Sequence, residues 1–283
     1  MKFSSGVNAP RLAVPDHATD CHHHIFDARF PAIPKAVLRP ADALVADYQA
    51  LQKRLGTQRN VIVQPSTYGV DNRLLVASIA AFRQANCRGV AVVNTEVTDA
   101  ELQSLHAHGV RGIRFNLAPP GATTLDMVIP LAKRIAPLGW HIQLNMPSDA
   151  LLAASHVWKN LPVPCVFDHL GRVPQPLGQA HPACNLIREL LQQGKAYVKL
   201  SGFYNESQVG APTYADSVEL ARLFAAEAPD FCLWGSDWPH PTERTDNMPD
   251  DANLMDCLAL AVPNAVIRER ILVSNPAALY GFG

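Results

Sequence analysis

Three consecutive histidines, His22, His23 and His24, follow a short β-like segment near the start of the chain. Side chains alternate between the two faces of a strand, so His22 and His24 point to one side and His23 points to the other. His169 and Asp237 come directly after two later segments of the same kind. Imidazole and carboxylate groups transfer protons near neutral pH, and both bind metals. The sequence therefore predicts a catalytic site built from His22, His24, His169 and Asp237.

Other polar residues stand at the ends of β-like segments and are candidate substrate contacts. They are Ser66, Arg114, Asn116, Gln143, Asn145, Lys199 and Tyr204. We expect Arg114 to bind a substrate carboxylate through paired N–H donors, with Ser66 donating to the same group. Lys199 is either a second cation in the cavity or an inward lysine paired with a carboxylate. Asp168 is interpreted as a partner of neighbouring backbone.

Six other histidines have a simpler interpretation. We expect them to be surface or helix residues: His23, His106, His108, His141, His156 and His181.

Short apolar runs alternate with amphipathic stretches along the whole chain. The predicted strands are Ala18–His24, Asn60–Gln64, Arg88–Val93, Gly112–Asn116, Trp140–Asn145, Pro164–His169, Ala196–Ser201 and Phe231–Gly235. Continuously apolar runs such as Val61-Ile62-Val63 are typical of parallel strands that are buried on both faces. Their spacing leaves room for a helix between consecutive strands.

Helix start signals support this alternation. Asp42 and Asp71 are expected N-caps, and Thr98 with Glu101 has the spacing of a capping box. Later helices are predicted at Pro182–Gln193, Tyr214–Ala226 and Asp250–Ala261. Eight strands, each followed by a helix, predict a closed (β/α)₈ barrel, with its site at the carboxyl ends of the strands. An open doubly wound sheet is the alternative, but the chain lacks the glycine-rich phosphate turn typical of that fold.

Composition limits the function classes. The chain has 283 residues, of which 48% are hydrophobic, and 24 basic residues balance 25 acidic ones. We expect no nucleic-acid partner, because a nucleic-acid surface needs a basic excess or stripe. We also expect no membrane association, because no apolar run is long enough to span a bilayer. One domain is predicted over residues 18–283, preceded by an arm over residues 1–17.

The ends of the chain and its cysteines indicate a compartment. The first ten residues, MKFSSGVNAP, have no apolar core like that of a signal peptide. The six cysteines are scattered and form no CxxC pair, so we expect reduced, mostly buried thiols and a cytoplasmic location. The sequence gives no signal for an oligomeric state.

Six motifs occur together and in a fixed order: DCHHHIFD, VIVQPSTYGVDN, GVRGIRFN, VFDHLGR, VKLSG and WGSDWPHP. This set resembles the amidohydrolase superfamily of the amidohydrolase-2 type. More narrowly, it resembles the branch that contains 2-pyrone-4,6-dicarboxylate lactonases and related lactone-processing enzymes. The resemblance extends from about residue 17 to the C-terminal NPAALYGF. It implies a distorted TIM barrel and hydrolysis of a ring ester.

The resemblance also bears on metal binding. Superfamily members usually hold metal through an HxH motif on strand 1, an acidic or carboxylated group on strand 4, histidines on strands 5 and 6, and an aspartate on strand 8. This chain has Arg114 on strand 4 and Gln143 on strand 5, and the lactonases that it resembles work without metal. We therefore expect no required cofactor. The alternative is one Zn²⁺ held by His22, His24 and Asp237, since three N/O ligands and a water make a catalytic zinc set.

Lactone hydrolysis assigns roles to these residues. Asp237 is the expected general base, and it could later return the proton to the leaving oxygen. The imidazoles of His22, His24 and His169 would surround the carbonyl, and one or two of them would carry a proton to polarise it. The alternatives are a lactone isomerase, a 2-pyrone-4,6-dicarboxylate hydrolase, a metal-dependent decarboxylase and, last, a carboxylate-binding barrel without activity.

The number of cationic anchors indicates the substrate. The stretches Leu117–Gly121 and Phe203–Gln208 lack the arginines with which the resembled lactonases hold a second carboxylate. The site is instead rich in neutral amides and hydroxyls. We therefore expect a lactone with at most one carboxylate and several hydroxyls, such as a sugar-acid lactone. The alternative is that Arg39, Arg172 or Arg244 reaches the site from another loop.

Overall fold

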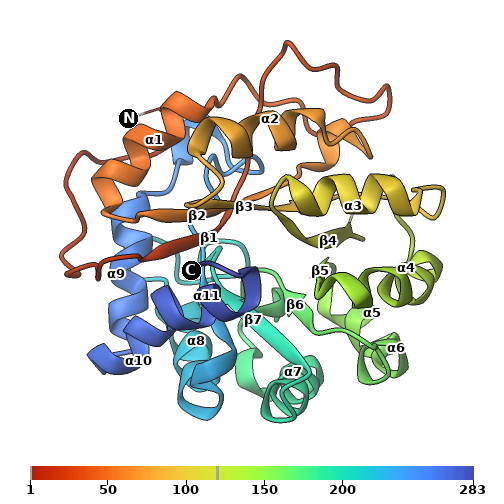
Figure 1. The fold of residues 1–283 in the computed structure, drawn as a ribbon. Coiled ribbons are helices and arrows are strands. Elements are labelled where there is room, and N and C mark those ends of the chain that lie inside the picture. Colours follow the sequence, from red (N-terminus) through yellow and green to blue (C-terminus); the bar gives the residue numbers. More distant parts are fainter. Residues whose placement is uncertain (1, 119–120) are drawn as a thin grey trace.

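The computed structural model describes residues 2–118 and 121–283, so Pro119 and Pro120 of the arginine-free stretch lie outside the described residues. Eight parallel strands follow one another in chain order, β1 to β8, and form a nearly closed barrel with helices around it (Figure 1). The strands are β1 Thr19–His23, β2 Arg59–Val63, β3 Cys87–Ala91, β4 Val110–Asn116, β5 His141–Asn145, β6 Cys165–Phe167, β7 Ala196–Leu200 and β8 Cys232–Trp234. The predicted (β/α)₈ barrel is confirmed, and each predicted strand overlaps an observed one.

Helices cover the outside of the barrel. They are α1 Val45–Leu55, α2 Arg73–Phe82, α3 Asp99–Ala107, α4 Val128–Ile135, α5 Ser148–Ala153, α6 Ser155–Lys159, α7 Pro182–Gln192, α8 Ala215–Glu227, α9 Asp251–Ala261, α10 Ala265–Glu269 and α11 Asn275–Tyr280. The capping box at α3 is confirmed, because Thr98 Oγ1 accepts from Glu101 N and the Glu101 carboxylate accepts from Thr98 N. The expectation that Asp42 caps α1 is wrong. The helix begins three residues later, where Asp47 accepts from Leu44 N.

The seam between β8 and β1 is joined by backbone hydrogen bonds from Asp237 N to His22 O and from His24 N to Trp238 O, and by one side chain. Asp20 accepts from the backbone N of Ser236 at 2.9 Å, from the Ser236 hydroxyl at 2.6 Å and from the Tyr48 hydroxyl at 2.9 Å. Gly235 lets the two strands approach, because a Cβ there would lie 2.6 Å from His22 Cβ. This seam brings the end of β8 beside β1, and with it Asp237 beside the histidines.

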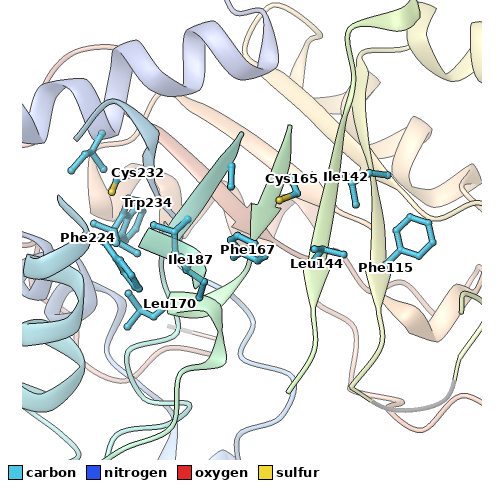
Figure 2. Packing of buried hydrophobic residues seen from close by; sticks show 14 of the residues in the cluster. Phe115, Ile142, Leu144, Cys165, Phe167, Leu170, Ile187, Phe224, Cys232 and Trp234 are labelled. Atoms are coloured by element: carbon cyan, nitrogen blue, oxygen red, sulfur yellow. The ribbon is translucent and has the colours of Figure 1, made fainter. Parts of the chain in front are cut away.

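Two apolar layers hold the barrel. Outward-facing residues of the strands, such as Phe115, Leu144 and Phe167, pack against the helices (Figure 2). Inside the barrel, a smaller cluster of Cys21, Val61, Val63, Val90, Val166 and Leu233 is closed by Tyr280 and Phe282 of the C-terminal segment. The C-terminal segment therefore closes the lower part of the barrel interior, and the polar residues gather at the opposite, carboxyl ends of the strands.

Two histidines expected at the surface or on helices are instead buried on strands. His23 stacks on Tyr48 with ring centroids 3.5 Å apart, and its Nε2 pairs with Asn60 Oδ1 at 3.0 Å. His141 starts β5 and points into the barrel, where Gly112 leaves room for its ring. That expectation was wrong because a strand buried on both faces hides either side chain of an alternating pair.

The N-terminal arm lies against α1 and α9. Arg54 of α1 donates to Asn8 O, Arg11 pairs with Asp256 of α9 at 2.9 Å, and Ser5 N donates to Pro249 O. All six cysteines are buried and unpaired. Within residues 2–118 and 121–283, no helix has the length and apolar character needed to cross a bilayer.

Candidate active site

A cavity of about 420 Å³ opens at the carboxyl ends of the strands. This volume suits a small-molecule site. Seven of the residues expected from the sequence line it: His24, Ser66, Arg114, Asn116, Asn145, His169 and Asp237. The side chains of His22, Gln143, Lys199 and Tyr204 lie behind this lining. The βα loops add an apolar wall that includes Phe26, Ile33 and Leu38.

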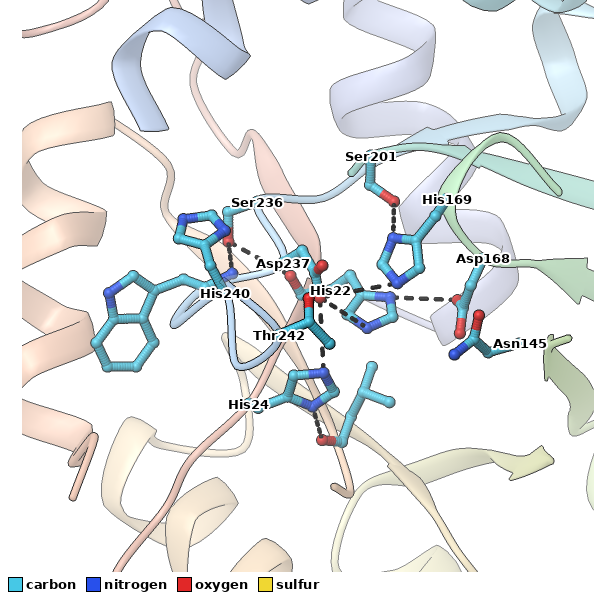
Figure 3. Close-up of polar contacts among 12 residues, drawn as sticks. His22, His24, Asn145, Asp168, His169, Ser201, Ser236, Asp237, His240 and Thr242 are labelled. Carbon is cyan, nitrogen blue, oxygen red and sulfur yellow. Dashed lines mark hydrogen bonds and ion pairs between the residues drawn. The ribbon is translucent and has the colours of Figure 1, made fainter. Parts of the chain in front are cut away.

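The carboxylate of Asp237 stands at the centre of three imidazoles (Figure 3). Its Oδ1 lies 3.6 Å from His22 Nε2, 3.6 Å from His24 Nε2 and 3.8 Å from His169 Nε2. The backbone of Asp237 has φ 65° and that of His169 has φ 50°, a left-handed conformation that non-glycine residues seldom adopt. Such strain is found mainly at functional sites, where the surrounding structure holds it. The predicted group of four residues is therefore assembled around one point.

Each imidazole is oriented from behind through its Nδ1. His24 Nδ1 donates to Val63 O at 2.7 Å, which leaves its Nε2 facing Asp237. His169 Nδ1 pairs with Ser201 Oγ at 3.0 Å. His22 Nδ1 has an acceptor and a donor within reach, because Asp168 Oδ1 and Lys199 Nζ both lie 3.2 Å away. These contacts keep all three Nε2 atoms directed at the same carboxylate.

The electrostatics of the group favour an ionised aspartate. Burial would raise the pKa of Asp237, but the neighbouring imidazoles His169, His24 and His22 hold it well below the usual carboxylate range. Burial lowers the pKa of His169, and it lowers that of His22 further with help from Lys199. Protonation of Asp237 and of the imidazoles around it is therefore mutually dependent, because a proton on an imidazole stabilises the carboxylate charge while burial opposes placing a proton there.

A buried polar layer supports the site from below. Asp168 Oδ2 accepts from Arg114 Nε at 3.2 Å and from Gln143 Nε2 at 3.1 Å. Lys199 Nζ donates to Gln143 Oε1 at 2.8 Å and lies 3.4 Å from Asp168 Oδ1. Both Gln143 and Lys199 are fully buried, so the structure corrects the expectation that they contact substrate. Asp168 is likewise a centre of side-chain pairing rather than a partner of neighbouring backbone.

Arg114 keeps part of its guanidinium available. Its Nε is used by Asp168, while its two terminal amino groups have no hydrogen-bond partner among the described residues. Because it also lines the cavity, Arg114 can offer a carboxylate the paired donors that the sequence analysis expected. Of the three other arginines considered, Arg172 reaches the cavity, where Glu206 pairs with it at 2.6 Å. Neither Arg39 nor Arg244 is part of the lining.

Neutral polar groups form a row on one wall. Asn145 Nδ2 donates to Asn116 Oδ1 at 3.0 Å, and Asn116 Nδ2 donates to Ser66 Oγ at 2.8 Å. Asn145 Oδ1 is buried and has no partner among the described residues. The hydroxyl hydrogen of Ser66 remains free to donate. This wall therefore offers a donor hydroxyl at Ser66, beside an amide oxygen of Asn145 that is buried.

Two functional candidates were missed by reasoning from the sequence. His240 and Asp251 stand behind Tyr204, which itself donates from its hydroxyl to Asp237 Oδ2 at 2.7 Å. His240 belongs to the WGSDWPHP motif, so its position three residues after Asp237 was a usable signal. Asp251 carries no local signal, because its contact with His240 spans a loop and a helix start.

Comparison with known proteins decides the family. The family model described as Amidohydrolase matches residues 19–282. The chain belongs to the amidohydrolase family. It is 36% identical over 99% of its length to a protein of Comamonas testosteroni named 2-pyrone-4,6-dicarboxylate hydrolase, covering 95% of that protein. It is 30% identical over 96% of its length to a D-galactarolactone isomerase of Agrobacterium fabrum, covering 94% of that protein.

Structural similarity is equally extensive. A crystal structure of an Agrobacterium tumefaciens protein in its apo state superposes with a TM-score of 0.92, at 28% identity, covering all of this chain and 99% of that one. The resemblance seen in the motifs is thereby confirmed, as is the amidohydrolase type of barrel.

The site contains a cluster of atoms that could act as ligands of a metal ion. One ligand atom each of His22, His24 and Asp237 lies within 4.8 Å of the others, and His22 Nε2 is buried without a hydrogen-bond partner among the described residues. Two imidazoles and a carboxylate fit a single divalent ion such as Zn²⁺. When bound there, such an ion would polarise a carbonyl and acidify a water.

Proposed function

We propose that this amidohydrolase is a lactonase, which opens the ring ester of a small lactone with Asp237 as general base. One observation carries the proposal: the ionised Asp237 carboxylate lies on the cavity lining, with three imidazole Nε2 atoms around its Oδ1 and a partly free arginine in the same cavity. A carboxylate whose pKa is held low is ionised at neutral pH, which is the charge state that a general base needs before it accepts a proton. The names of the two relatives also support lactone chemistry.

The bonds change as follows. Asp237 takes a proton from a water molecule while the water oxygen bonds to the lactone carbonyl carbon, giving a tetrahedral oxyanion. The bond from this carbon to the ring oxygen then breaks, and the proton held by Asp237 passes to the leaving alkoxide. The product is an open-chain hydroxy acid. Arg114 holds a substrate carboxylate through its terminal amino groups, which keeps the carbonyl next to Asp237.

We propose further that hydrolysis requires no metal, although the donor set would accept one. Two cations stand near the histidines: Arg114 pairs with Asp168, and Lys199 Nζ lies 3.2 Å from His22 Nδ1. Positive charge so close to a candidate ligand opposes binding of a divalent ion. Asp237 and the imidazoles then act as base and hydrogen-bonding groups.

For the substrate we propose a lactone with one carboxylate and several hydroxyls. Arg114 supplies one buried cationic anchor, and the charge of Arg172 is largely met by Glu206. Lys35, which also lines the cavity, is exposed to solvent. Asn116 and Asn145 on one wall of the cavity are neutral amides, which suit a hydroxyl better than a second carboxylate. The neighbouring Ser66 adds a hydroxyl donor on the same wall. A sugar-acid lactone meets these demands better than a planar pyrone dicarboxylate.

A panel of lactones tests the proposal. The purified enzyme would be incubated in H₂¹⁸O with sugar-acid lactones and with 2-pyrone-4,6-dicarboxylate, and products identified by NMR and mass spectrometry. Hydrolysis places one ¹⁸O in the new carboxylate. Isomerisation gives a new lactone without label, which would favour the isomerase alternative. A kcat/KM clearly higher for the pyrone would show that the site holds two carboxylates, and no turnover of any lactone would overturn the lactonase.

A further inference from the structure

Behind the Asp237 carboxylate, on the side away from the three histidines, lies a row of three polar side chains. The Tyr204 hydroxyl donates to Asp237 Oδ2 at 2.7 Å and lies 3.0 Å from His240 Nδ1. The Nε2 of His240 lies 3.2 Å from both carboxylate oxygens of Asp251. His240 and Asp251 are fully buried. Figure 3 shows His240 close to Asp237, on the side opposite His169.

The hydrogen positions in this row follow from counting donors. The Tyr204 hydroxyl has one hydrogen, which it gives to Asp237, so towards His240 it acts as an acceptor and Nδ1 carries a hydrogen. The Nε2 must also carry a hydrogen, because the Asp251 carboxylate only accepts. All contacts are therefore satisfied together when His240 is an imidazolium. Burial opposes this charge, but Asp251 more than offsets it and raises the pKa of His240 above its usual value, with Asp237 and Glu243 adding to the effect.

Distant parts of the chain meet in this row. Tyr204 belongs to the loop after β7, His240 to the loop after β8, and Asp251 is the first residue of α9. The backbone N of Asp251 in turn donates to Ser4 Oγ of the N-terminal arm at 3.2 Å. A row that joins two catalytic loops, a helix start and the arm is rigidly placed, which is what a support for a catalytic side chain requires.

The consequence for Asp237 is a fixed orientation. Rotation about its Cβ–Cγ bond would turn Oδ1 away from His22, His24 and His169, and the Tyr204 hydrogen bond to Oδ2 opposes that rotation. We infer that Tyr204 is a positioning residue, held by the His240–Asp251 pair, which keeps Oδ1 of Asp237 directed at the reacting centre. The inference rests on the proposed role of Asp237 as the base. Tyr204 does not line the cavity, so it acts on the base and not on the substrate.

Three variants test the inference. Tyr204→Phe removes only the hydroxyl, and Tyr197→Phe is the matched control, because Tyr197 lies on β7 against Phe231 and outside the cavity. His240→Gln removes the imidazolium. We expect Tyr204→Phe to lower kcat roughly tenfold to a hundredfold, the worth of one hydrogen bond to a charged group, with KM within about threefold. Tyr197→Phe should leave both constants unchanged.

The double variant provides the sharper outcome. If His240 acts through the Tyr204 hydroxyl, adding His240→Gln to Tyr204→Phe lowers kcat no further than Tyr204→Phe alone. If the losses of kcat in the two single variants multiply in the double variant, the inference that His240 acts through Tyr204 is wrong. A Tyr204→Phe enzyme with a raised KM and an unchanged kcat would also contradict the inference. Thermal melts of each variant confirm folding.

Crystal structures of wild type and Tyr204→Phe separate this inference from the proposed function. A turned Asp237 carboxylate in the variant supports positioning, even if no lactone of the panel is hydrolysed. An unmoved carboxylate in an enzyme that turns over lactones would overturn positioning and leave the lactonase standing.

Discussion

Replacing Asp237 with asparagine removes the proposed base while changing the shape of the site very little. Tyr204 can still donate to the amide oxygen, which would take the place of Oδ2. The amide nitrogen would then occupy the place of Oδ1, 3.6 Å from His24 Nε2. That imidazole nitrogen can accept a hydrogen, because His24 Nδ1 already donates to Val63 O. We therefore expect a folded variant that is destabilised by about 1–3 kcal/mol at neutral pH, because the carboxylate charge that the fold stabilises is lost.

The loss should fall on the chemical step. General acid–base catalysis is typically worth a factor of about 10²–10⁴, which corresponds to about 3–5 kcal/mol of barrier, and the amide cannot accept the proton. Steady-state kcat and KM would be measured by acid release from the best lactone of the panel, with thermal melts on the same preparations. The control is Asp126→Asn, an exposed aspartate outside the cavity. A folded Asp237→Asn enzyme with kcat within about threefold of wild type would refute the role of Asp237.

Three further predictions concern metal, substrate anchoring and pH. Treatment with a chelator should leave kcat/KM unchanged, and activity that disappears and returns with Zn²⁺ would instead make His22, His24 and Asp237 ligands. Arg114→Met should lower kcat/KM roughly tenfold to a hundredfold for a lactone that carries a carboxylate, and far less for a lactone without one. Equal losses of kcat/KM on both lactones would show that Arg114 supports Asp168 rather than the substrate. The pKa of Asp237 in the folded protein lies below its value in the unfolded chain, so the carboxylate stays ionised. Its contribution to stability is present above about pH 4 and is lost as the pH falls through the folded pKa. A pH profile of kcat/KM should accordingly show no loss of activity from this group between about pH 5 and 7, and an acid limb that moves in Asp237→Asn would contradict this assignment.

The strand ends were predictable because two independent signals coincide there. Apolar runs identify strands that are buried on both faces, and polar residues such as Arg114 and His169 interrupt those runs where the strands reach the site. The motif around Asp237 marks the eighth strand in the same way. Local sequence was also sufficient for the capping box of Thr98 and Glu101, since both partners lie within one helical turn.

Burial depth was not predictable from the same signals. Gln143 and Lys199 stand on strand positions that point inward, just as Asn145 does, yet the first two lie beneath the site and Asn145 lines the cavity. Depth along the barrel axis depends on the register between neighbouring strands, and the sequence contains no measure of that register. The surface interpretation of His23 and His141 failed for the related reason that strand residues can face either of two buried layers.

The sequence by itself determined the barrel, the family and the four residues that meet at Asp237 Oδ1, because each depends on periodicity or on motifs that are contiguous in the chain. Only the tertiary structure decided which of the polar strand residues line the cavity and which side chains contact the far side of the Asp237 carboxylate. Tyr204, His240 and Asp251 come from three separate segments, and their row exists because the loops after β7 and β8 meet the start of α9. The hydrogen-bond accounting that makes His240 an imidazolium requires all three partners at once. No single segment of the sequence contains that information.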